Sequence, residues 1–365
     1  MPFDALFLTD ELREAVSDRA WTDAMVDAER ALLRVQFMEE LPAIDVDPDE
    51  LLREGRRAGN PVEPLVRRLR DVAPNVHHGA TSQDILDTAM ALVARSAGAI
   101  VRREADGVAA VCARLADEHR ASVLVGRTLL QQATPTTFGL KAAAWLTGVL
   151  QARELPSLPA QLGGASGTLA AFGSDALDVR RRFAAELGLP EPDLSWHADR
   201  VPVAKLGAAL AMVAGACAKI ALDVQLLAQT EVGEVREADG GASSTMPHKR
   251  NPVASTLARA CASGAEAAAL ELVRGVGGHE HERAAGAWHA EWRGVSDALA
   301  LTGSAAAWTR AALEGLEVDT ERMRANVRAE TLSEARRFGG AARPEDYLGA
   351  ADELIDRALA RFRGA

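Results

Sequence analysis

Three polar segments of this chain carry side chains that suit the binding of an anionic substrate. They cover residues 77–84, 126–137 and 240–252. A Ser/Thr cluster before a helix is, taken alone, usually only a helix cap. Together, the segments supply hydroxyls, cationic side chains and backbone N–H groups at predicted helix starts, which are the donors that bind carboxylates. The third segment is also polar and rich in glycine, which is typical of a loop that closes over a ligand.

The stretches between these polar segments have the apolar spacing of helices. Alanine recurs throughout, aromatic residues make up only 4%, and no window alternates convincingly as a strand. Helices are predicted over residues 17–37, 83–119, 136–155, 203–238, 253 to beyond 271, 285–313 and 347–362. The sequence therefore predicts an all-α protein, in which a central bundle of long helices carries smaller helical end domains. The expected domains are residues 1–100 (N-terminal), 101–315 (central bundle) and 316–365 (C-terminal).

The helix predicted over residues 203–238 indicates an oligomer. It is apolar on almost every face over residues 206–218, and a helix that is apolar all round is buried on all sides. At 1.5 Å per residue it would be about 50 Å long, and a chain of this size does not easily surround such a rod. We therefore favour a helix core shared between subunits over the alternative, a central helix within one large bundle.

Composition and charge indicate which partners and which cellular compartment to expect for this chain. The chain has 365 residues and a formal net charge of −11, so no nucleic acid partner is expected. The apolar stretch 206–218 is too short to span a bilayer, and the N-terminus has no signal-peptide pattern. Cys112, Cys217 and Cys261 are too widely spaced for a disulfide framework, and the His/Glu run 279–282 lacks the further ligands of a metal site. We expect a cytoplasmic, soluble protein with buried free thiols, no metal and no membrane contact.

The third polar segment resembles the signature loop of the fumarase/aspartase superfamily. That loop reads Gly-Ser-Ser-x-Met-Pro-x-Lys-x-Asn-Pro, and residues 241–252 read GASSTMPHKRNP, with one additional alanine before the serines. Four stretches resemble the 3-carboxy-cis,cis-muconate cycloisomerase family of that superfamily, namely LGGASGTLAAFG (162–173), SWHADR (195–200), STMPHKRNPV (244–253) and ERAAGAWHAEW (282–292). The resemblance implies an all-α homotetramer with sites shared between subunits, a small polycarboxylate substrate and no cofactor. It also implies a shortened C-terminal domain, because the family is usually longer between residues 335 and 343.

The same resemblance implies roles for individual residues. Ser243, six residues before the loop lysine, corresponds to the catalytic base, while Lys249 and Asn251 would hold the carboxylate where negative charge accumulates. His77 matches the family's His-x-Gly-x-Thr-Ser histidine and would bind substrate or move a proton; the alternative is a histidine that only fixes the loop. In the Ser-Trp-His stretch, we expect Arg200 to bind an anion, and we expect His197 to be structural or to support residues that contact the substrate. The other expected substrate-binding residues are Thr81, Ser82, Arg127, Gln131, Thr136, Ser244 and Met246.

The second polar segment departs from the superfamily pattern. Amine- and hydroxide-releasing relatives carry Thr-His-x-Gln there, and that histidine helps to protonate the leaving group. This chain has Thr128-Leu129-Leu130-Gln131. A carboxylate, with a pKa of about 4, leaves readily as the anion and needs no such acid. The missing histidine therefore favours a weakly basic leaving group and argues against adenylosuccinate and argininosuccinate chemistry.

Three functional hypotheses follow from the sequence. The leading one is a cofactor-independent isomerase that interconverts 3-carboxy-cis,cis-muconate and its lactone in aromatic catabolism, by proton transfer next to a carboxylate. The second is a superfamily lyase that expels another stable anion, such as nitrite from nitrosuccinate. The third is a catalytically silent helical oligomer, against which the presence of Ser243, Lys249 and Asn251 argues.

Overall fold

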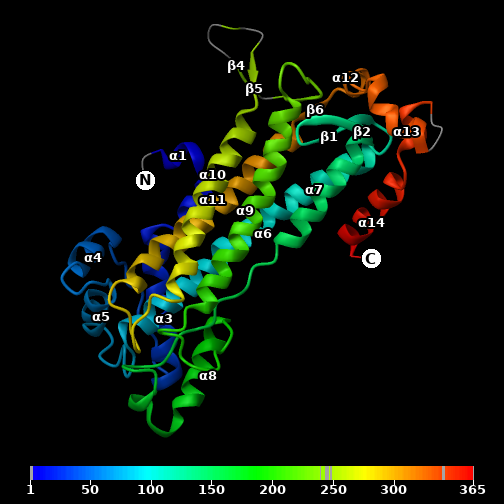
Figure 1. Ribbon diagram of the computed structural model, residues 1–365. Helices are drawn as coiled ribbons and strands as arrows, with labels where there is room; N and C mark the ends of the chain where they lie inside the picture. The colour runs from blue at the N-terminus through cyan, green and yellow to red at the C-terminus, as the bar shows by residue number, and fades with distance from the viewer. Residues whose placement is uncertain (1–2, 239, 243–245, 247–248, 339–341, 365) are drawn as a thin grey trace. The chain divides into compact units, whose positions relative to one another are not determined.

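A computed structural model describes residues 3–238, 240–242, 246, 249–338 and 342–364 (Figure 1). Contacts between residues group the chain into two units. The first unit consists of Met1–Ile100, Leu155–Ala211 and Gly264–Leu301, and the second of Val101–Glu154, Met212–Ser263 and Thr302–Ala365. The three consecutive domains expected from the sequence stay a prediction.

The first unit is helical. It contains α1 (Asp4–Phe7), α2 (Asp10–Ala15), α3 (Asp18–Phe37), α4 (Pro48–Gly55), α5 (Val62–Arg70), the 3-10 helix η1 (Ala170–Asp175) and α8 (Ala176–Leu187). It also contains the first parts of α6 (Ser82–Glu118), α9 (Val201–Leu227) and α11 (Ala287–Glu314), and the last part of α10 (Val253–Gly275).

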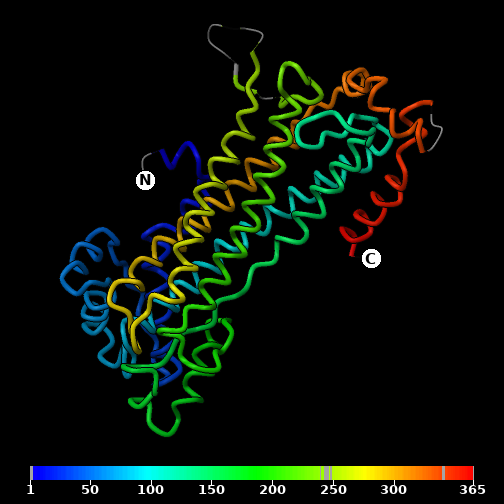
Figure 2. Tube along the Cα trace, in the orientation of Figure 1, coloured from blue at the N-terminus to red at the C-terminus, as the bar shows by residue number. Residues whose placement is uncertain are grey.

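The second unit contains the remaining parts of α6, α9, α10 and α11. Its other helices are α7 (Phe138–Ala152), α12 (Thr320–Ala325), η2 (Ala329–Leu332), α13 (Ser333–Phe338), η3 (Pro344–Tyr347) and α14 (Ala351–Arg363). Its strands are β1 (Val123–Thr128), β2 (Gln131–Thr137), β3 (Val235–Glu237), β4 (Gly241–Ala242), β5 (Arg250–Asn251) and β6 (Leu316–Val318). Within this unit, Figures 1 and 2 show α7 alongside the last part of α6.

Helix α3 shows why the predicted helices form. The Ser17 side chain accepts a hydrogen bond from the Ala20 N–H, which caps the first turn. Met25, Leu32 and other apolar residues at helical spacing are buried on one face. The helix predicted over residues 17–37 is therefore confirmed, and the helical class of the whole chain is confirmed with it.

Helix α9 is shorter than predicted. The sequence predicted a helix to residue 238, whereas α9 ends at Leu227. Gly233 then adopts a φ of 63°, and β3 pairs antiparallel with β6, so residues after 227 follow a turn and a strand. By length and composition alone α9 could cross a membrane, but half of its most apolar window is buried inside the protein, as in the core helix of a soluble protein.

The sequence has no window that alternates convincingly as a strand, yet the structure contains short strands. In the described part of the chain, six short strands pair into three two-stranded sheets. The β1–β2 hairpin runs from the Val123–Thr137 pair to the Thr128–Gln131 pair. Its turn residues, Leu129 and Leu130, have φ values of 50° and 64°. A two-residue turn with this geometry usually carries Asn-Gly, so a Leu-Leu turn escapes recognition in the sequence.

The cysteines lie in apolar surroundings. Cys112, Cys217 and Cys261 are buried, as predicted, and form no disulfide with the described residues. Burial raises the pKa of Cys217 to about 12 and that of Cys261 to about 11. These thiols therefore remain protonated at neutral pH and are inert packing groups.

Candidate active site

In the first unit, Asp84 joins the first polar segment to two of the stretches that resemble the cycloisomerase family. Its carboxylate accepts hydrogen bonds from the N–H groups of Thr81 (3.0 Å), Gly163 (2.8 Å) and Gly164 (2.9 Å). His197 Nε2 lies 2.7 Å from the same carboxylate, and both side chains are buried. Four donors on one carboxylate hold the three loops in one arrangement. The structural role expected of His197 agrees with this geometry.

Arg200 is fully buried between two carboxylates. It contacts both oxygens of Asp87, at 2.8 and 3.1 Å, and its Nε and Nη2 lie 2.9 and 2.6 Å from Glu291. Its guanidinium also stacks on the Trp196 ring, and Trp288 Nε1 donates to Asp87. Burial lowers the pKa of Arg200, but the two carboxylates raise it above its ordinary value. No face of this guanidinium is left for a ligand, so the expected anion-binding role of Arg200 is corrected to a structural one.

His77 and Ser82 line a common cavity in the first unit. His77 Nδ1 lies 2.6 Å from the buried Glu29 carboxylate. Thr81 lies beside Ser82 in the chain, and its hydroxyl accepts a hydrogen bond from Arg283 at 2.7 Å. The cavity has a volume of about 550 Å³ and is lined by Glu63, Val66, Arg67, Arg70, Asp71, His77 and Ser82. The structure therefore brings two predicted residues of this segment, His77 and Ser82, to one cavity.

In the second unit, Arg127 is paired within the protein. Its two terminal nitrogens lie 2.9 and 2.6 Å from the two oxygens of Glu234, whose side chain is fully buried. Asn326 donates a further hydrogen bond to Glu234 at 2.8 Å. A bidentate pair of this kind occupies the fork that would bind a substrate carboxylate. The expected substrate-binding role of Arg127 is therefore corrected: it anchors the β1 strand to the segment that precedes β3.

Gln131 and Thr136 lie on β2 of the hairpin. Gln131 is exposed beside the turn, whereas Thr136 is half-buried and pairs with Leu124 of β1. At the tip, Leu129 is 96% and Leu130 is 76% exposed. Leu129 and Leu130 thus form an apolar tip that reaches into solvent in the isolated chain.

The signature loop is described at its two ends. Ser243 and Ser244 lie outside the described residues. Met246 and Lys249 are exposed, and Asn251 is half-buried in β5. Asn251 pairs with Gly241 across the small sheet and donates its amide to the Gly241 carbonyl at 3.3 Å.

The start of α10 is capped by an acidic residue of the same chain. The Glu237 carboxylate accepts from the N–H groups of Ala254 and Ser255, each at 3.0 Å, and from the Ser255 hydroxyl at 2.6 Å. From the sequence, N–H groups at predicted helix starts were expected among the donors for a carboxylate ligand. Glu237 already occupies those N–H groups, so α10 does not offer them to a substrate.

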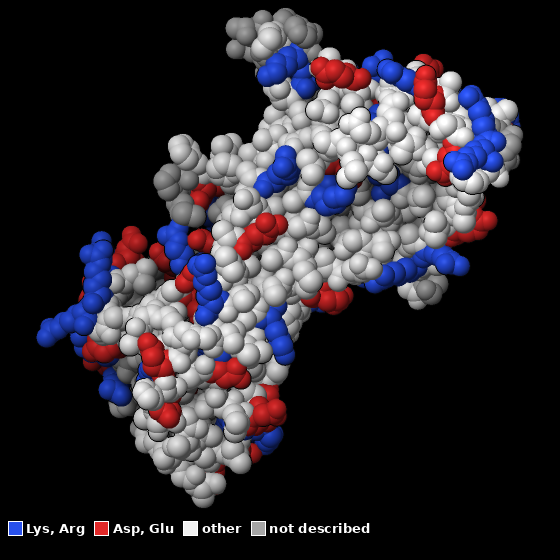
Figure 3. Space-filling view, viewed as in Figure 1, with Lys and Arg blue, Asp and Glu red and all other residues white. Residues whose placement is uncertain are grey.

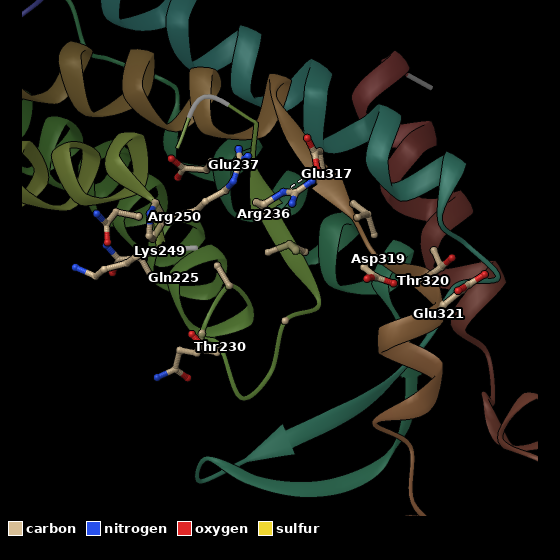
Figure 4. Close-up of a pocket in the computed structure, with 17 residues that line it drawn as sticks. Gln225, Thr230, Arg236, Glu237, Lys249, Arg250, Glu317, Asp319, Thr320 and Glu321 are labelled. Carbon is tan, nitrogen blue, oxygen red and sulfur yellow. Dashed lines mark hydrogen bonds and ion pairs between the residues drawn. The ribbon is translucent and has the colours of Figure 1, made fainter. Parts of the chain in front are cut away.

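A cleft of about 970 Å³ adjoins the described ends of the loop. In Figure 4, Lys249, Arg250 and Gln225 lie on one side, Asp319, Thr320 and Glu321 lie on the other, and Arg236 forms an ion pair with Glu317 between them. The charged residues that line the cleft are three cations and four carboxylates, namely Arg236, Lys249, Arg250, Glu237, Glu317, Asp319 and Glu321. Figure 3 likewise shows both signs of charge interspersed over the face that it draws. Lys249 and Asn251 are thus within one cleft, but this cleft alone is not a cationic pocket for a polycarboxylate.

Sequence reasoning missed the carboxylates that hold these side chains. The side chains of Glu29, Asp84, Glu234 and Glu237 are all buried. Each binds a predicted site residue, a loop or the start of a helix. One signal was present: Glu29 lies at helical spacing with the buried apolar residues of α3, where an acidic side chain is out of place. For Glu234 and Glu237 the local sequence carries no such signal.

Comparisons with known proteins agree with this picture. Residues 10–265 match a family described as Lyase. The chain is 46% identical to a nitrosuccinate lyase of Streptomyces davaonensis over 350 residues (86% of this chain, 74% of the relative). It is 41% identical to a 3-carboxy-cis,cis-muconate cycloisomerase of Bradyrhizobium diazoefficiens over 352 residues (87% and 77%). The crystal structure of the 3-carboxy-cis,cis-muconate lactonizing enzyme of Pseudomonas putida superposes with a TM-score of 0.90 at 33% identity, covering 100% of this chain and 99% of that one. The chain therefore belongs to the lyase family of the fumarase/aspartase superfamily.

Proposed function

We propose that this enzyme interconverts 3-carboxy-cis,cis-muconate and its lactone without a cofactor. The observation that carries the proposal is the exposed apolar hairpin tip at Leu129. The superfamily pattern that this segment resembles has at that position the histidine that protonates basic leaving groups. A lactone opens by releasing a carboxylate, which needs no acid. Support also comes from the likeness to cycloisomerases over nearly the whole chain.

In the lactone-opening direction, a base removes the proton from the carbon next to a carboxylate. The electron pair is delocalised into that carboxylate and then forms the new C=C bond, as the ring C–O bond breaks and its oxygen leaves as a carboxylate. Lactone formation reverses these steps. We assign the base to Ser243, and we assign the stabilisation of the carbanion-like intermediate to Lys249 and Asn251. Thr81, Ser82, Gln131, Thr136, Ser244 and Met246 remain proposed substrate contacts.

A second candidate is the elimination of nitrite from nitrosuccinate. The 46% identity to a nitrosuccinate lyase favours it. Nitrite is also a weakly basic anion, so the same missing acid is compatible with this reaction. The two candidates share the removal of a proton next to a carboxylate and differ in the anion that leaves.

We further propose a cytoplasmic homotetramer with sites shared between subunits. Superfamily members are homotetramers with shared active sites that act on small carboxylates. In this chain the apolar helix α9 exposes Met212, and α10 exposes Leu270 and Val273, each between 45% and 56%. Exposed apolar side chains on long helices suit burial against further copies of the chain.

The experiment is a parallel assay of two substrates with one enzyme preparation. The ultraviolet absorbance of the diene reports 3-carboxy-cis,cis-muconate, and coupling to an azo dye reports nitrite released from nitrosuccinate. Loss of the diene absorbance without nitrite release supports the leading proposal, and the reverse result selects the second candidate. Ser243→Ala should abolish nearly all turnover while the oligomer stays intact by size-exclusion chromatography. A fully active Ser243→Ala enzyme would contradict the assignment of the base.

A further inference from the structure

The pair formed by His77 and Glu29 has a feature that stability does not explain. Glu29 lies on α3 and is fully buried, and its Oε1 is 2.6 Å from His77 Nδ1. Its other oxygen, Oε2, is buried as well and forms no hydrogen bond with the described part of the chain. A buried carboxylate with one unsatisfied oxygen costs stability. Its presence therefore calls for a role beyond packing.

The Glu29 contact determines which ring nitrogen of His77 is available. An ionised carboxylate only accepts hydrogen bonds, so Nδ1 carries a hydrogen as long as the contact persists. Nε2 is then the ring nitrogen that is left for a ligand. His77 also has a φ of 62°, in the left-handed region that residues other than glycine rarely adopt. Strained backbone of this kind concentrates where the direction of a side chain matters for function.

The exposed part of the His77 ring borders the 550 Å³ cavity of the first unit. The His77 side chain is 13% exposed, and its Nδ1 is the nitrogen that contacts Glu29. The residues that line the cavity also include Ser82 and Arg70. The other charged residues that line the cavity are Arg67, Glu63 and Asp71. Arg67 forms ion pairs with Glu54, at 2.8 Å, and with Glu63. A hydroxyl, an arginine and an imidazole N–H are donors that together bind a carboxylate.

We propose that Glu29 is a positioning residue that directs Nε2 of His77 into this cavity. The protonated ring then donates its Nε2–H to a substrate carboxylate on which negative charge accumulates during proton abstraction. The hydrogen stays on the ring, so no bond is made or broken at His77. The inference rests on the proposed function, because it takes the substrate to be a polycarboxylate.

The first test needs no substrate. Protein labelled with ¹⁵N-histidine is compared as wild type, Glu29→Gln and Glu39→Gln, and His77→Gln identifies the His77 signals. Glu39 is a matched control, because its carboxylate binds Asn75 of the same loop at 2.8 Å. The wild type and the Glu39→Gln protein should show neutral His77 as the Nδ1–H tautomer, and Glu29→Gln should show a mixture of tautomers. The same pure tautomer in all three proteins would overturn the proposal.

The second test uses propane-1,2,3-tricarboxylate as the probe. Titration should shift the His77 Nε2 signal of the wild type, and the affinity should fall about tenfold or more in Glu29→Gln but not in Glu39→Gln. Equal affinities in all three proteins, or no shift of the His77 signal, would refute a carboxylate contact. With an active substrate, Glu29→Gln should lower kcat/KM, and the double variant Glu29→Gln/His77→Gln should lose no more than His77→Gln. If the wild type turns over neither substrate, the proposed function fails, whereas the tautomer and the tricarboxylate affinity still decide the role of Glu29.

Discussion

Replacing Arg200 with methionine is expected to destabilise the protein severely. The guanidinium is 0% exposed, and its partners Asp87 and Glu291 are 0% and 1% exposed. Methionine fills most of the same volume but leaves both carboxylates buried without their shared cation. Breaking a buried ion pair in this way costs about 3–5 kcal/mol. Because whole domains are stable by only about 5–15 kcal/mol, this single change removes a large share of the total.

Urea unfolding at equal protein concentrations measures the effect. The control is Arg343→Met, which removes an exposed ion pair with Asp346 and should change the unfolding midpoint little. Arg200→Met should shift the midpoint far more. A substrate ligand would behave differently, because its loss would lower substrate affinity and leave the midpoint near that of the wild type. Equal midpoints for the two variants would therefore refute the structural role of Arg200.

Three further predictions test the packing of the second unit. Gly139→Ala should destabilise the protein by about 1–3 kcal/mol, because the new Cβ would lie 2.6 Å from the Ala116 carbonyl oxygen and 2.6 Å from Arg120 Cα. The control is Gly148→Ala on the same helix, whose Cβ meets nothing within 4 Å and which should be neutral or slightly stabilising. Similar urea unfolding midpoints for the two variants would contradict this prediction. Leu129→Asn combined with Leu130→Gly should raise the thermal midpoint by relieving about 1–2 kcal/mol of left-handed strain, and a lower midpoint would show that the leucines are stabilised by a contact elsewhere. Burial is the largest influence on the pKa of Lys141 and lowers it below the ordinary value of 10.5. The unfolded chain therefore binds the Lys141 proton more tightly than the folded chain does, so the stability of the fold rises as the pH approaches 10.5 from below. Lys141→Met should flatten that rise in urea unfolding series between about pH 8 and 10, and an unchanged slope would disprove the linkage.

Most of the helices could be predicted from local pattern alone. Helix α3 follows from the Ser17 cap and the apolar spacing behind it, which act within a few turns of chain. The strands could not be predicted in the same way. The three-residue strand β3 is stabilised by its pairing with β6, about eighty residues later in the chain. The Leu129–Leu130 turn lacks the Asn-Gly or Asp-Gly pair by which a hairpin is usually recognised in a sequence.

The residue types in the three polar segments and in the signature loop already indicated carboxylate chemistry and the superfamily, because the side-chain donors and their spacing are properties of the chain itself. Which cations are free for a ligand depended on tertiary contacts. Arg200 pairs with Glu291, 91 residues away, and Arg127 pairs with Glu234, 107 residues away. Two cations that the sequence offers as ligands for an anion are therefore neutralised within the protein. Glu29 approaches His77 across 48 residues in the same manner. Such pairings follow from packing rather than from local spacing, because burial forces each charge to find a partner wherever the fold brings one close.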